Sequence, residues 1–158
     1  MLDTLFDLAN VVAIVGWLSL LASPFAPRAA DWIGGTLAPL ALALGYTACL
    51  VGFALFGTGE APQGVSFTTL DGVAALLSTR EALLAGWVHY LAFDLFVGAW
   101  EVREGRRLFL PFAAVAPCLL LTFVSGPLGL LVFLLLRAAM RRRLLLHEPG
   151  RASAGASG

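Results

Sequence analysis

Four stretches of about 20 predominantly apolar residues dominate this chain of 158 residues, and each is long enough to cross a bilayer as an α-helix. They run at about residues 2–22, 36–57, 81–100 and 110–137. Only 13% of the residues are charged and the mean hydropathy is +0.89, whereas soluble domains need about 25% charged residues to hydrate their surface. The sequence therefore predicts an all-α, polytopic membrane protein. We expect a bundle of four transmembrane helices within residues 1–143, followed by a disordered polar tail at 144–158.

The arginines predict how such a bundle is oriented. All ten basic residues are Arg, and four spans would put six of them on the side of both termini and the 58–80 connector, against four on the other side. Because cytoplasmic flanks are enriched in basic residues, we expect both termini in the cytoplasm. The composition, rich in Arg, Ala, Gly and Leu, is typical of a bacterial inner-membrane protein. The Arg run at 141–143 indicates anchoring at anionic lipid and no nucleic-acid partner.

The connectors and prolines add detail. Residues 23–35 hold two prolines and a Gly pair, which predicts a short turn at the membrane surface. The longer 58–80 connector carries an apolar patch, so it is expected to lie on the bilayer or to cover a site. In the last span, Pro127 removes a backbone donor and frees the carbonyl of Phe123. Such a break indicates a helix that faces protein or a polar cavity there.

Asp94 lies at bilayer depth with apolar residues on both sides. An ionisable group there costs roughly 2.5–3.5 kcal/mol on insertion scales, so it normally faces the protein interior or a wet cavity. Helical periodicity puts Trp87 and Tyr90 on the same face as Asp94, while His89 lies about 140° away. The second face groups His89 with three aromatic residues, Phe93, Phe96 and Trp100.

The first span carries a second polar stripe. Asp3, Asp7 and Asn10 follow at i, i+4 and i+7, and Ile14 and Trp17 continue the same line. Asn10 is the deep member, and it would form either an interhelical hydrogen bond or a substrate contact.

His89 leaves three roles open: an interhelical hydrogen bond, general acid/base chemistry, or ligation of a haem. Cys49 and Cys118 lie singly in apolar segments, so they indicate neither a disulfide nor a zinc site.

Two segments resemble the neoxanthin-synthase-like family of four-helix membrane proteins. They are "AGWVHYLAFDLFVGAW" and, after a short charged turn, "PCLLLTFVSGPLGLL"; the first span, "LFDLANVVAIVGWLSLLASP", is also similar to the family's opening helix. The resemblance covers about residues 2–136. One departure is "VSGP", where plant members often have "FCP" or "FGP".

The resemblance implies an isomerase of a carotenoid-like epoxide, which opens the epoxide and loses a vinylic proton. This chemistry is redox-neutral and requires no cofactor, only an acid and a base in a dry apolar slot. The resemblance implies Asp94 and His89 as the acid/base pair and Tyr90 or Asn10 as a hydrogen-bond donor to the oxygen. The slot walls would be aromatic: Trp87, Phe93, Phe96 and Trp17. In a bacterial membrane, an isoprenoid is the expected substrate class.

Two other classes of function remain open. A non-catalytic membrane protein would bind a pigment or a haem, the latter through His89, or would help to assemble another complex. A small transporter would use Asp94 as a proton relay, but the chain has no inverted repeat of the kind that such proteins carry. Small residues at Gly45, Ala48 and Gly52 also make a homo-oligomer a candidate assembly.

Overall fold

The computed structural model describes residues 1–56 and 63–141, and within these residues it is helical with connecting turns and no strand. The predicted tail at 144–158 lies outside the described residues. The elements in chain order are α1 (Leu2–Leu21), α2 (Pro27–Ala29), the π-helical η1 (Ala30–Leu37), α3 (Ala38–Phe56), α4 (Leu70–Leu76), α5 (Arg80–Arg107), α6 (Phe112–Ser125) and α7 (Pro127–Arg141).

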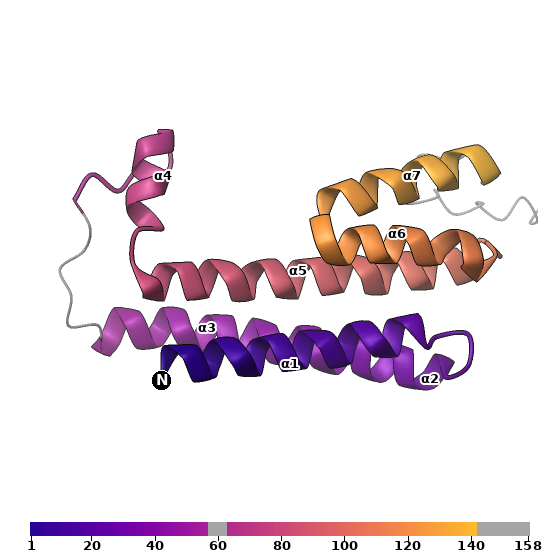
Figure 1. Cartoon of the computed structure of the whole chain (residues 1–158), viewed down its shortest axis with the longest axis horizontal. Helices are drawn as coiled ribbons and strands as arrows, with labels where there is room; N and C mark the ends of the chain where they lie inside the picture. Colours follow the sequence, from indigo (N-terminus) through magenta and orange to yellow (C-terminus); the bar gives the residue numbers. More distant parts are fainter. Residues whose placement is uncertain (57–62, 142–158) are drawn as a thin grey trace, which may run out of the picture.

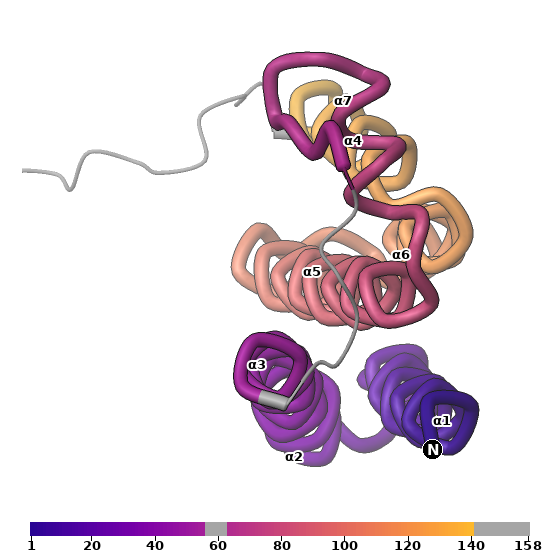
Figure 2. Tube along the Cα trace, turned by 90° about the vertical axis from the view of Figure 1, so that its left-hand side faces the viewer, coloured from indigo at the N-terminus to yellow at the C-terminus, as the bar shows by residue number. Residues whose placement is uncertain are grey.

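The long helices form layers. In Figure 2, seen end on, α1 and α3 lie beside each other on one side of α5, and α6 and then α7 lie on the opposite side. Three helical segments are long and apolar enough to cross a membrane among the described residues: Leu2–Leu21, Pro27–Leu55 and Arg80–Arg107. The predicted spans at 2–22 and 81–100 are therefore present as helices. The helix at 81–100 continues for two more turns, to Arg107.

The second span begins earlier than expected. Residues 27–35 were predicted to belong to a surface turn, but α2 and η1 continue into α3 as one helical segment from Pro27. Pro27 suits the first position of a helix because its missing N–H needs no partner there. Gly34 lies against α1, where an added Cβ would stand 2.7 Å from the carbonyl oxygen of Gly16. The Gly pair thus provides close helix packing, and not a turn.

The expected fourth span at 110–137 consists of two helices, so the predicted count of four spans is not confirmed among the described residues. The chain reverses at Gly126, so α6 and α7 form an antiparallel hairpin that packs on one half of α5 (Figure 1). With 14 and 15 residues, each helix is about 21–23 Å long. That is less than the hydrocarbon thickness of about 30 Å, so neither helix, over its described residues, is long enough to cross a membrane by itself.

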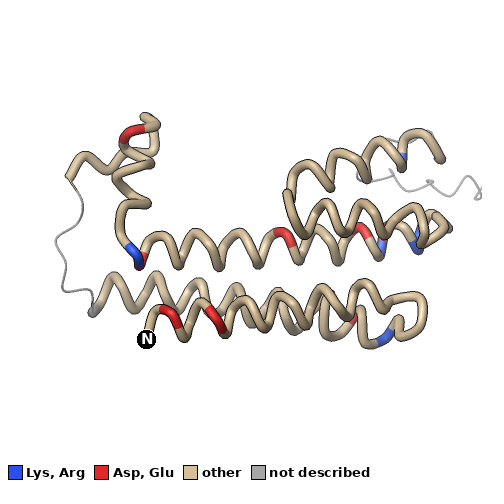
Figure 3. The backbone as a smooth tube through the Cα atoms, in the orientation of Figure 1, with Lys and Arg blue, Asp and Glu red and all other residues tan. Residues whose placement is uncertain are grey.

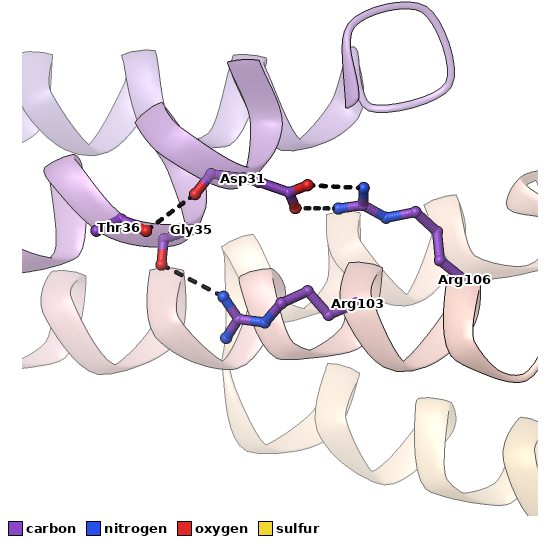
Figure 4. Close-up of polar contacts among 5 residues, drawn as sticks. All are labelled: Asp31, Gly35, Thr36, Arg103 and Arg106. Carbon is purple, nitrogen blue, oxygen red and sulfur yellow. Dashed lines mark hydrogen bonds and ion pairs between the residues drawn. The ribbon is translucent and has the colours of Figure 1, made fainter. Parts of the chain in front are cut away.

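Polar contacts fasten the end of α5 to η1 (Figure 4). The guanidinium of Arg106 makes two hydrogen bonds to the carboxylate of Asp31, one of them 3.1 Å from Nη1 to Oδ2. Nη1 of Arg103 donates to the carbonyl of Gly35 at 3.4 Å. Bidentate Arg–carboxylate pairs fix geometry as well as charge. The start of the second helical segment is therefore held in register with the end of α5.

The hairpin also sets where the last described helix ends. The N-terminus is at one end of the bundle, whereas α7 ends at the opposite end, beside the end of α5 (Figure 1). The expectation that both termini share one side assumed a fourth complete span; residues 142–158 lie outside the described residues, so it stays a prediction. Figure 3 shows that most of the basic residues drawn in blue lie at the end of the bundle away from the N-terminus.

Candidate active site at the hairpin turn

Asp94 lies midway along α5, fourteen residues after Arg80 and thirteen before Arg107. It is half-buried and belongs to a stripe on the α5 surface that also holds Trp87 and Tyr90. The hairpin packs on the half of α5 that leads to its C-terminal end and leaves the other half without it (Figure 1). Asp94 therefore lies where the turn of the hairpin meets the middle of a spanning helix.

The carboxyl of Asp94 packs directly against Gly126, the residue between α6 and α7. A Cβ added to Gly126 would stand 2.5 Å from Oδ1 and 2.8 Å from Oδ2 of Asp94. Among the described residues, Oδ2 is shielded from solvent without a hydrogen-bond partner. α7 begins at the next residue, Pro127, so its positive N-terminal end favours a negative charge at this place.

Tyr90 completes the polar group. Its hydroxyl donates to the carbonyl oxygen of Val124, in the last turn of α6, at 3.4 Å. Tyr90 precedes Asp94 by one turn on the same face of α5. A phenol and a carboxyl thus lie one turn apart near the middle of α5, both beside the end of α6.

Asn10 and Trp87 extend this group toward α1. The indole N–H of Trp87 donates to Oδ1 of Asn10 at 3.2 Å, and the Asn10 amide donates to the carbonyl of Phe6 at 2.7 Å. The ring centroids of Trp87 and Tyr90 are 5.5 Å apart. Four of the predicted site residues therefore form one continuous strip: Asn10, Trp87, Tyr90 and Asp94.

The structure places the other half of the predicted site elsewhere. His89, Phe93 and Phe96 are exposed on another face of α5, as the spacing of about 140° indicated. The ring of His89 lies 4.6 Å from that of Phe93 and 5.4 Å from that of Tyr46 on α3. His89 and Asp94 therefore do not share a cavity, and an acid/base pair made of these two residues does not fit the geometry.

Trp17 is a packing residue between helices. Its side chain is 4% exposed, lies edge-on to Phe123 at 5.5 Å, and fills the place where Gly98 has no side chain. It lines a small apolar gap of about 120 Å³ between α1 and α6. Trp17 is separated from the strip that contains Asp94, so it does not form a wall of that site.

Sequence reasoning missed a buried polar group under the hairpin. Glu101 is fully buried and accepts a hydrogen bond from the Thr122 hydroxyl of α6 at 2.9 Å. Glu104 pairs with Arg137 of α7 at 2.9 Å, and Arg137 is fully buried as well. The sequence offered one signal, because helical periodicity puts Glu101 on the same face as Asp94. For Arg137 it offered none, because a basic residue near the end of an apolar segment predicts an anchor at the membrane surface.

The strip can support proton transfer, but it does not resemble a metal site. Within residues 1–56 and 63–141, no three His, Cys, Asp or Glu side chains lie close enough to share a metal ion. His89 could ligate a haem only from the outer face of α5. What Asp94 and Tyr90 can do together is take a proton from one atom of a ligand and give one to another, in a place shielded by Trp87 and the hairpin.

Three membrane-length helices, a helical hairpin and a carboxyl at the hairpin turn define a small helical membrane protein with an intramembrane polar site. Within that class, the chain belongs to the ABA DEFICIENT 4-like family, whose sequence model matches residues 4–133. This confirms the resemblance that the first, third and last apolar segments indicated. None of the curated proteins or solved structures compared with the chain matches it.

Proposed function

We propose that this protein is an integral-membrane isomerase of a lipophilic, carotenoid-like epoxide, acting in a bacterial inner membrane. Membership of the ABA DEFICIENT 4-like family supports a role in carotenoid metabolism. The observation that carries the chemical part of the proposal is the position of the Asp94 carboxyl against Gly126 at the hairpin turn, with the Tyr90 hydroxyl one turn earlier on the same face of α5.

The proposed reaction moves two protons and no electrons. The Tyr90 hydroxyl gives its proton to the epoxide oxygen as the C–O bond breaks, and the Asp94 carboxylate takes the proton from the neighbouring vinylic carbon. The electron pair of that C–H bond forms the new double bond, so the product is an allenic alcohol of unchanged composition. Transfer of the proton from Asp94 to the Tyr90 phenolate restores both groups. The positive end of α7 favours Asp94 as the base, which differs from the pairing with His89 that the sequence suggested.

The test is a comparison of carotenoids from membranes that contain an epoxy-carotenoid, with and without the protein. We expect a new isomer with the wild-type chain and none with Asp94→Asn, which removes the base but keeps the size of the side chain. Asp7→Asn is the matched control, because Asp7 is an exposed carboxylate on α1. Full conversion by Asp94→Asn, at equal amounts of inserted protein, would contradict the proposal.

A non-catalytic pigment- or haem-binding protein is the second candidate. The observation that favours it is the outer face of α5, where His89 is exposed in apolar surroundings beside Phe93 and Tyr46. The absorption spectrum of purified protein separates these cases. A Soret band that disappears in His89→Ala would assign haem binding to this face.

A further inference from the structure

A separate cavity lies where α1 and α5 begin, at the end of the bundle that holds Met1. It has a volume of about 270 Å³ and lies between the first two turns of α1 and the first three turns of α5. Two charged residues line its rim, Asp3 and Arg80, and the other walls are apolar or aromatic. These walls are formed by Leu2, Phe6, Leu83, Leu84 and Trp87. We call it the end cavity.

The rim of the end cavity is polar but carries no net charge. Nη2 of Arg80 lies 2.5 Å from Oδ1 of Asp3, and both side chains are largely exposed, at 70% and 78%. The pair offers a donor and an acceptor side by side. A hydroxyl group can accept from the guanidinium and donate to the carboxylate, whereas an anionic headgroup would meet repulsion from Asp3.

The lining of the end cavity ends at Trp87, which lies one turn before Tyr90 on the face of α5 that leads to Asp94. Arg80, Leu83, Trp87, Tyr90 and Asp94 follow at i, i+3, i+7, i+10 and i+14, so they share one face of α5. The rings of Phe6 and Trp87 are 5.9 Å apart, and Trp87 then contacts Tyr90. The helical rise puts Asp94 about 21 Å from the rim. An elongated apolar molecule lying along this face would touch aromatic rings for most of that length.

We propose that the end cavity binds the distal, hydroxyl-bearing end of an uncharged, elongated lipophile whose other end reaches Asp94. The inference rests on the proposed function for the reacting end, and it adds a second contact that selects oxygenated over purely hydrocarbon substrates. The other two cavities fit this role less well. The gap between α1 and α6 is lined only by apolar side chains, and the groove of about 180 Å³ between α1 and α3 has no charged residue.

Binding of two probes to the purified protein in detergent tests the proposal. The probes are a carotenoid with a hydroxyl on each end ring and the corresponding carotene, and the retained polyene is measured by its absorbance. We expect the dihydroxy compound to bind about tenfold more tightly, as one net hydrogen bond would provide. Equal affinity for the two probes, or displacement of the bound carotenoid by an anionic phospholipid, would overturn the inference.

Variants connect the binding to the end cavity. Leu83→Trp fills the cavity and should abolish the preference, while Leu44→Trp adds the same bulk at an exposed position on α3 and should retain it. The double variant Asp3→Ala/Arg80→Ala should bind both probes equally. Unchanged discrimination in Leu83→Trp would overturn the assignment.

The two proposals fail separately. Asp94→Asn should retain the preference for the dihydroxy probe while it loses conversion. If conversion depends on Asp94 but discrimination survives in Leu83→Trp, the isomerase proposal stands and the end cavity has no role in binding. If the preference for the dihydroxy probe depends on the end cavity while Asp94→Asn converts substrate normally, the end cavity binds the ligand and the isomerase proposal is wrong.

Discussion

At the scale of single residues, Gly126 and Asp94 depend on each other. Gly126 has φ +34°, a conformation that residues with a Cβ rarely adopt, and the space beside its Cα is occupied by the Asp94 carboxyl. The same glycine thus allows the chain to reverse and admits the carboxyl to the start of α7. A side chain at this position would have to displace the group that we assign as the base.

Gly126→Ala should therefore destabilise the protein and reduce conversion. Backbone strain of this kind costs about 1–3 kcal/mol, and the clash with Asp94 adds to it. The control is Gly52→Ala on α3, where an added Cβ meets nothing within 4 Å; there the better helix propensity of Ala should leave stability unchanged or slightly raised. Thermal unfolding in detergent, followed by circular dichroism, measures both. Equal melting temperatures for the two variants would contradict the role given to Gly126.

The sequence predicted part of this arrangement and missed the rest for a physical reason. That Trp87, Tyr90 and Asp94 share a face, and that His89 does not, follows from the helical period alone, and the structure agrees. The contact between Asp94 and Gly126 joins residues 32 positions apart, and it exists because α6 packs back along α5 and ends at Gly126. No local pattern encodes such a contact, so the partner of Asp94 could not be read from spacing.

At the scale of elements, the hairpin is the feature that hydropathy misjudged. Residues 110–137 are apolar almost throughout, and a proline by itself commonly leaves a kinked helix that still spans. Here Pro127 follows a glycine with positive φ and becomes the first residue of α7. The reversal then places Arg137 beside α5, where it forms an ion pair with Glu104. A charge that looked interfacial in the sequence is in fact buried.

The Glu104–Arg137 pair should hold the hairpin on α5. Arg137→Met removes the buried partner of Glu104, so it should cost about 1.5–3 kcal/mol of stability, the range for a hydrogen bond to a charged group. Arg107 offers a matched control, because it binds the same carboxylate at 2.7 Å but is 47% exposed, so Arg107→Met should cost much less. Chemical unfolding in detergent compares them. In the double variant Glu104→Leu/Arg137→Met, the loss should be smaller than the sum of the single losses; strict additivity would count against a direct pairing.

At the scale of the whole molecule, the hairpin alters the distribution of charge across the membrane. Of the arginines whose side chains are described, Arg80 alone lies at the start of α5, beside Asp3 at the start of α1. The other five lie in α2, in the last two turns of α5, or beside those turns: Arg28, Arg103, Arg106, Arg107 and Arg137. The prediction of six arginines on one side against four on the other assumed a complete fourth span. Among the described residues the difference between the two ends is larger, and the arginine-rich end is the one opposite Met1. The arginine-rich end is now the one expected in the cytoplasm.

Site-directed labelling can test this orientation. Phe25 in the α1–α2 link and Phe67 before α4 are 91% and 82% exposed and lie at opposite ends of the bundle. In a chain with Cys49 and Cys118 replaced by Ala, we expect Phe67→Cys to react with a membrane-impermeant thiol reagent in intact cells, and Phe25→Cys to react only after the cells are opened. The physical reason is that moving a cluster of arginines across the bilayer during insertion costs far more than moving the acidic end that carries Asp3 and Asp71. The opposite labelling pattern would put the arginine-rich end outside, and the end cavity would then open toward the cytoplasm.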